Sequence, residues 1–78
     1  MSSLNGGNSS AVYYLIELEK SMENKTGYSY RALIEALGEA GGREAVYHLI
    51  ELAKSKENKN SETYRIIIQS IGKAGRVV

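Results

Sequence analysis

The chain contains one sequence unit twice. The segment Ala11–Leu18 returns almost unchanged as Ala45–Leu52, which sets a period of 34 residues. When residues 11–42 are aligned with residues 45–76, 18 of 32 positions are identical. A fixed period of about 20 to 50 residues is typical of repeat proteins, in which each unit buries its apolar face against the next unit. The duplication therefore predicts an array of small stacked units.

Length and composition restrict how such an array can be stabilised. The chain has 78 residues, no cysteine and a net charge of +1. Disulfides and thiolate metal sites are therefore excluded, and packing between units has to supply the stability of a small domain. No apolar run approaches the roughly 18 residues of a membrane span, so we expect a soluble protein without membrane contact. Residues 1–10 are small, polar and glycine-containing, and we expect a disordered leader, or a remnant of an expression vector, outside the fold of residues 11–78.

Apolar residues recur at helical spacing in both units, which predicts an all-α fold with about four helices. The first three helices are expected over residues 11–25, 28–40 and 43–57. Ser10 is the expected N-cap of the first helix, and Gly41-Gly42 the expected end of the second. The fourth helix is expected to start from a cap at Asn60 or Ser61 and to stop at Gly75. Its β-branched run at residues 66–68 suits a strand locally, but the duplicate segment has a helical pattern, so we predict a helix there.

The same spacing predicts the core. We expect the apolar residues that keep helical phase to be buried, including both tyrosines at equivalent positions, Tyr30 and Tyr64, with their hydroxyl groups in water. The predicted core consists of Val12, Leu15, Ile16, Leu18, Met22, Tyr30, Leu33, Ile34, Leu37, Val46, Leu49, Ile50, Ala53, Tyr64, Ile67, Ile68 and Ile71. Gly38 and Gly72 fall at one repeat position inside helices, which indicates that a neighbouring helix approaches the backbone there.

Each unit resembles the pentatricopeptide repeat. Tyr30, the Leu33-Ile34 pair and the Ala40-Gly41 turn follow one another in the order and at the distances of that family, and residues 64–76 repeat the pattern. The resemblance covers nearly everything after residue 10, although the period is one residue shorter than the common repeat. It implies a right-handed α-solenoid of helical hairpins, here a fragment with the helix order B-A-B-A. Both ends of such a stack would expose uncapped apolar faces, so we expect self-association.

The resemblance also implies a function and a set of contacts. Members of this family bind single-stranded RNA at about one base per repeat, each base being read by a pair of side chains. The first member of the pair maps onto Arg31 and Arg65, and the second onto Thr26 and Asn60, while Tyr28 is a further candidate contact near a helix start. Threonine and asparagine suit base edges, whereas arginine suits a phosphate or a base face. The expected protein is a segment of an organellar RNA-processing or expression factor in a mitochondrion or chloroplast.

The alternative function is a protein-interaction or scaffolding repeat that uses its concave face as tetratricopeptide repeats do. The weak net charge favours it, and so do Glu35 and Glu39, which would repel phosphate. Apart from either function, the alternative to a ligand contact for Arg31 and Arg65 is an ion pair with a nearby glutamate.

We predict no enzymatic activity, no cofactor and no metal site. The chain has no aspartate and a single histidine, His48, which lacks the partners that catalysis or metal binding requires. Its repeat counterpart is Tyr14, so packing or a surface hydrogen bond is the expected role of His48.

Overall fold

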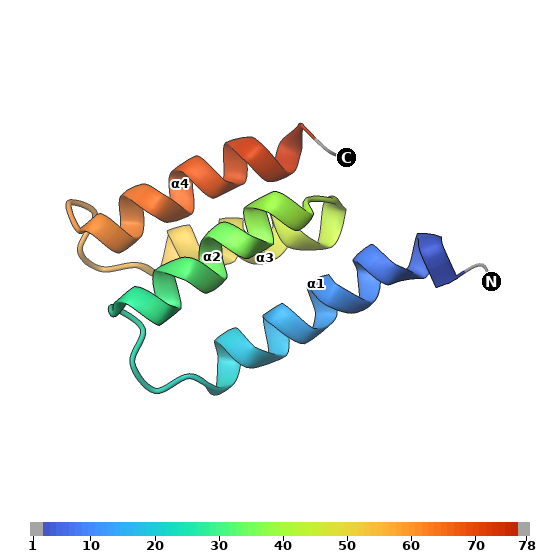
Figure 1. Ribbon diagram of the computed structural model, residues 1–78. Coiled ribbons are helices and arrows are strands. Elements are labelled where there is room, and N and C mark those ends of the chain that lie inside the picture. Colours follow the sequence, from blue (N-terminus) through green and yellow to red (C-terminus); the bar gives the residue numbers. More distant parts are fainter. Residues whose placement is uncertain (1–2, 77–78) are drawn as a thin grey trace.

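The computed structural model describes the backbone of residues 3–76 and the side chains of residues 10–76 (Figure 1). This part of the chain consists of four α-helices without a strand: α1 (Ser3–Ser21), α2 (Tyr28–Ala40), α3 (Arg43–Ser55) and α4 (Glu62–Gly75). The all-α prediction is therefore confirmed for the described residues, including the β-branched run at residues 66–68. None of these helices combines the length and the apolar character that crossing a bilayer requires.

The start of α1 differs from the prediction. The helix begins at Ser3, so Ser10 lies inside it and is not its N-cap. The segment that was expected to be a leader outside the fold therefore joins the first helix from Ser3 on, and residues 1–2 lie outside the described part. Gly6 and Gly7 have low helix propensity and concealed this continuation, because sequence patterns weigh local propensity more than extension from an established helix.

Both helices that precede a long turn end earlier than predicted. α1 stops at Ser21 instead of residue 25, and α3 stops at Ser55 instead of residue 57. In the turns that follow, Asn24 Oδ1 accepts a hydrogen bond from the Thr26 N–H at 3.0 Å, and Asn58 Oδ1 accepts one from the Asn60 N–H at 2.9 Å. These local bonds offer the backbone an alternative to further helix. Asn24 and Asn58 occupy equivalent positions in the two units, so the same interaction follows the end of α1 and of α3.

The other predicted helix ends are confirmed. α2 has its predicted bounds, and the turn after it consists of Gly41 and Gly42, with φ angles of 71° and 94° that favour glycine. Ser61, not Asn60, caps α4: its Oγ accepts a hydrogen bond from the Tyr64 N–H at 3.0 Å.

Equivalent helices of the two units lie against each other. α2 contacts α4, α1 contacts α3, and α2 lies between α1 and α4 in Figure 1 with α3 behind. The apolar side chains buried between the helices are those of Val12, Tyr30, Leu33, Ile34, Leu37, Ala45, Leu49, Ile67 and Ala74. Leu18 and Ile68 were predicted to be buried but are 37% and 45% exposed, because each lies on a surface that no other described helix covers.

The close approach predicted at the two helix glycines occurs at only one of them. A Cβ atom added to Gly38 would lie 2.9 Å from the Cβ of Ser70 and 3.0 Å from its Cα. At Gly72 the same addition would meet nothing within 4 Å. Gly38 therefore allows α2 and α4 to pack closely, whereas no described helix of the same chain approaches Gly72, so within the chain the expectation was wrong there.

Candidate functional site

The two long turns lie together at one end of the molecule, opposite the short glycine turn between α2 and α3 (Figure 1). We call this end, formed by residues 22–31 and 56–65, the loop end. All five residues that we predicted to contact a ligand belong to the loop end: Thr26, Tyr28, Arg31, Asn60 and Arg65. The helix packing and the asparagine turns described above fix its backbone.

In the second unit, Asn60 and Arg65 line one open hollow of about 300 Å³. The remaining lining residues are Lys59, Ser61, Tyr64 and Ile68. Arg65 Nη1 donates a hydrogen bond to Glu62 Oε1 at 3.2 Å, but both side chains are more than half exposed. Exposed pairs of this kind contribute about 0–1 kcal/mol, so Arg65 can exchange its carboxylate for a ligand anion.

Lys59 forms a cationic wall of this hollow. Its Nζ lies 5.1 Å from the centroid of the Tyr64 ring, a distance that allows a cation–π interaction. The same ammonium donates hydrogen bonds to the carbonyl oxygens of Ala53 at 3.1 Å and Lys56 at 3.0 Å. These bonds hold a positive charge at the carboxyl end of α3, where it compensates the negative end of the helix dipole.

Thr26 of the first unit lines a second hollow of about 370 Å³, whose other lining residues belong to the second unit: Ser55, Lys56, Glu57, Asn58 and Ser61. Ser61 borders both hollows. Arg31 Nη1 donates to the Thr26 carbonyl oxygen at 2.8 Å, so Arg31 holds the backbone of its own turn. Tyr28 is 80% exposed and borders neither hollow. The structure thus brings Thr26, Asn60 and Arg65 to two adjoining hollows and leaves Tyr28 apart.

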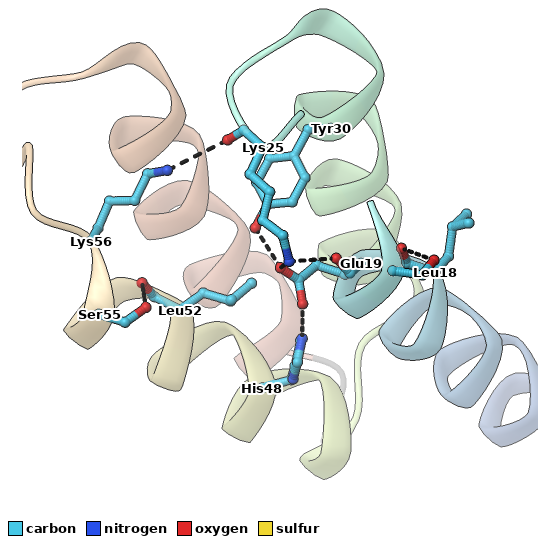
Figure 2. Close-up of polar contacts among 9 residues, drawn as sticks. Leu18, Glu19, Lys25, Tyr30, His48, Leu52, Ser55 and Lys56 are labelled. Atoms are coloured by element: carbon cyan, nitrogen blue, oxygen red, sulfur yellow. Dashed lines mark hydrogen bonds and ion pairs between the residues drawn. The ribbon is translucent and has the colours of Figure 1, made fainter. Parts of the chain in front are cut away.

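A buried polar network lies directly behind the loop end (Figure 2). Its centre is Glu19 of α1, whose side chain is only 3% exposed. Tyr30 Oη donates to Glu19 Oε2 at 2.7 Å, and Lys25 Nζ donates to the same oxygen at 3.1 Å. His48 Nε2 lies 2.9 Å from the other carboxylate oxygen, Oε1. The network therefore joins three helices and the first long turn at one carboxylate.

The charge of Glu19 depends on these partners. Burial by itself raises the pKa of the Glu19 carboxyl, but the hydrogen bonds from Tyr30, His48 and Lys25 outweigh burial and leave the pKa below its usual value of 4.5. Glu19 is therefore ionised at neutral pH. Burial, together with the hydrogen bond to this carboxylate, raises the pKa of Tyr30, which keeps its proton and acts as the donor.

Two lysines tie the network to the turns. Lys25 Nζ also donates to the Glu19 carbonyl oxygen at 2.7 Å, and Lys56 Nζ donates to the Lys25 carbonyl oxygen at 3.5 Å. Their ammonium groups lie 6.0 Å and 5.9 Å from the centroid of the Tyr30 ring. The first long turn is thereby held against the end of α3, which fixes the position of Thr26.

The network corrects two predictions. The Tyr30 hydroxyl is bound to a buried carboxylate instead of water. His48 forms a hydrogen bond, as expected, but with that buried carboxylate instead of at the surface. Glu19 was missed, although a signal existed: it lies seven residues after Val12, in phase with the buried stripe of α1. The second unit has Ala53 at the equivalent position, so the duplication did not point to it.

A third hollow, of about 420 Å³, lies between α1 and α3. Repeat-equivalent residues face each other across it: Tyr13 with Tyr47, which are 54% and 60% exposed, and Glu17 with Glu51. The other lining residues are Ile16, Lys20, Glu44 and His48. We call this hollow the outer groove. It is aromatic and acidic, in contrast with the loop end.

The loop end presents cations, amide and hydroxyl groups, and aromatic rings around open hollows. This combination suits a ligand that carries both negative charge and hydrogen-bonding groups. No family model, curated protein or solved structure matches this chain.

Proposed function

We propose that this protein is a pentatricopeptide-like repeat segment that binds single-stranded RNA at its loop end. The observation that carries the proposal is that Asn60 and Arg65 line one open hollow together with Lys59 and Tyr64. Asn60 offers hydrogen bonds to a base edge, Arg65 and Lys59 offer charge to a phosphate, and Tyr64 offers a ring for stacking. These are the groups that a single strand requires.

The arrangement of the helices supports the repeat-array part of the proposal. Contacts between equivalent helices, α1 with α3 and α2 with α4, are what a stack of hairpins in the order B-A-B-A would make. The helices whose first turns border the hollows, α2 and α4, would be the first helices of their units. In such an array, successive loop ends would line up, and a strand could cross from the Thr26 hollow to the Asn60 hollow past Ser61.

A titration of fluorescently labelled ten-nucleotide homopolymers of RNA tests the proposal. We expect binding that weakens as salt rises, because counterions are released from the strand. Each lost phosphate contact should reduce the logarithmic salt slope by about 0.7, which corresponds to roughly 2–3-fold less salt dependence between 50 and 200 mM. Arg65→Ala and Lys59→Ala should each produce this reduction. Fluorescence anisotropy measures both the affinity and the slope.

Lys73→Ala provides the matched control for the RNA titration. Lys73 is also an exposed cation on α4, paired with Glu39 at 3.4 Å, but it lies near the opposite end of the helix. Its removal should leave the salt slope unchanged. Affinity that ignores salt, or that survives the double replacement of Arg31 and Arg65 by alanine, would contradict RNA binding at the loop end.

The outer groove supports a second candidate function, protein interaction. Three glutamates, Glu17, Glu44 and Glu51, surround an aromatic hollow that suits a lysine or arginine side chain of a partner peptide. Titration with an acetylated Arg-Leu-Arg peptide should perturb the Tyr13 and Tyr47 resonances in NMR spectra. Tyr47→Ala should weaken binding about fivefold or more, as loss of a cation–π contact of roughly 1 kcal/mol or more would. An equal response to an acetylated Glu-Leu-Glu peptide would argue against this function.

A further inference from the structure

The interface between the two units uses one face of α2. Tyr30, Ile34, Leu37 and Gly38 are buried on this helix, and Gly38 lies against Ser70 of α4. On the other helix layer, His48 of α3 reaches Glu19 of α1. The two units therefore contact each other through two pairs of helices, α2 with α4 and α1 with α3.

The second unit repeats these residue types on α4, where no described helix covers Ile68 or Gly72. Thirty-four residues after four of the five buried positions of α2 stand Tyr64, Ile68, Ile71 and Gly72, and the fifth, Leu33, corresponds to Ile67, which is buried against the core. Ile34 is fully buried, whereas its equivalent Ile68 is 45% exposed. Gly72 has nothing within 4 Å of an added Cβ, where Gly38 has Ser70. We call this set of four residues the open face of α4.

The first unit carries the complementary surface, which is half-buried at Ala36 and exposed on α1. The equivalent of Ser70 is Ala36, again a small residue that would allow close approach to a glycine. On α1, Tyr14 is the equivalent of His48 and is 67% exposed, and Leu18 is the equivalent of Leu52 and is 37% exposed. The chain thus forms one interface between its two units. Among the described residues it also exposes two surfaces that could form a second interface of the same kind.

We infer that a second copy of this chain stacks on the open face of α4, with its Ala36 against Gly72 and its α1 against α3. The new junction continues the internal interface by the same step that relates the two units. It requires no buried carboxylate, because Ala53 stands where the internal interface has Glu19, so no ion has to be desolvated. This inference does not depend on RNA binding.

The stacking geometry has two consequences. The two surfaces of the junction differ, so the contact is head-to-tail, and a head-to-tail contact that does not close on itself adds copies into an open chain. Tyr64 and Ile68 also line the hollow that contains Asn60, so stacking covers one wall of that hollow.

Cysteine pairing tests the inference, because the chain has no cysteine of its own. Ala36→Cys and Gly72→Cys are made as separate variants, mixed, and oxidised with oxidised glutathione. By analogy with the close contact of Gly38 and Ser70, the two sulfurs come within reach of a disulfide. The mixture should form a disulfide-linked dimer at a yield at least tenfold above that of either variant alone. Electrophoresis without reductant measures the yield.

Glu35→Cys mixed with Gly72→Cys is the matched control. Glu35 is exposed and adjacent to Ala36, but it projects from α2 about 100° away around the helix. Its dimer yield should be at least tenfold below that of the Ala36 pair. Equal yields for the two pairs, or equal yields from single variants and mixtures, would overturn the head-to-tail junction.

Sedimentation equilibrium provides an independent readout without any cysteine. The average mass of the unmodified chain should rise with concentration beyond that of a dimer. Ile68→Glu should keep the sample monomeric, and because Ile68 is exposed, its helical circular dichroism should not change. A wild-type chain that remains a monomer at millimolar concentration would refute the stacking.

Discussion

Replacing Glu19 by alanine should lower the free energy of unfolding by about 3 kcal/mol. The change leaves the buried Tyr30 hydroxyl without its acceptor at 2.7 Å and takes the carboxylate away from Lys25 and His48. Breaking a buried ion pair costs about 3–5 kcal/mol, and the lower end applies because the Lys25 side chain is 40% exposed and can turn to water. Because a chain of this length has roughly 4–12 kcal/mol in total, a large part of its stability would be lost. Urea denaturation followed by circular dichroism measures the loss.

Glu17→Ala is the control for this loss. Glu17 lies on the same helix, its side chain is 75% exposed, and it reaches Lys20 only at 4.0 Å. Its removal should change the free energy of unfolding by less than about 0.5 kcal/mol. If the two variants lost equal amounts, the network would be irrelevant to stability and α1 would respond only to its net charge.

The pH dependence separates the charge of Glu19 from its packing. The pKa of Glu19 in the folded protein lies below 4.5, so its ionised form contributes stability above about pH 4.5, and this contribution is lost as pH falls through the folded pKa. Glu19→Gln preserves the size and an acceptor for Tyr30 but cannot ionise. The gap in unfolding free energy between wild type and this variant should therefore narrow below pH 4.5. A gap that stays constant from pH 7 to pH 3 would assign the effect to packing alone.

The loop end could be predicted in part because its residues follow from the duplication. Thr26 and Asn60 occupy equivalent positions after equivalent helices, so any fold that stacks the two units brings their turns to the same end. The number and type of the helices follow from the same pattern. The partner of each side chain does not, because Arg31 turns back to the Thr26 carbonyl whereas its equivalent Arg65 pairs with Glu62. Thr26 and Asn60 differ little from each other, so the residues next to Arg31 and Arg65 determine which partner each arginine contacts.

The features that the sequence did not reveal are those that differ between the units. Glu19 has alanine as its equivalent, and a single glutamate within an apolar stripe gives a weak signal until its partners from α2 and α3 are in place. For Ile68 the duplication itself misled the prediction, because its equivalent Ile34 is fully buried whereas Ile68 is exposed. Periodicity assigns a residue to a face of its helix, but only the neighbouring helix determines whether that face is covered.

The two glycines turn this difference into a measurement. Gly38→Ala should destabilise the protein by up to about 2 kcal/mol, because its Cβ would press on the backbone of Ser70, and the overpacking cost of about 1–3 kcal/mol is offset by only about 1 kcal/mol of helix propensity. Gly72→Ala meets no atom within 4 Å and should stabilise the protein by up to about 1 kcal/mol. Thermal unfolding at micromolar concentration, where copies stay apart, measures both changes.

A compensating change shows whether contact causes the loss at Gly38. Ser70→Gly removes the Cβ atom that would lie 2.9 Å from the new methyl group, while the Ser70 Cα at 3.0 Å and carbonyl oxygen at 3.1 Å remain. In the Ser70→Gly background, Gly38→Ala should therefore lower the free energy of unfolding by less than it does in the wild type, but the loss should not vanish. Shifts of the same sign at Gly38 and Gly72, or no coupling between Gly38 and Ser70, would mean that helix propensity governs both positions. Stability changes of opposite sign at the two glycines, together with coupling between Gly38 and Ser70, would establish that Gly38 is a contact between the units. Gly72 would then be the equivalent position on a surface that remains open to a neighbour.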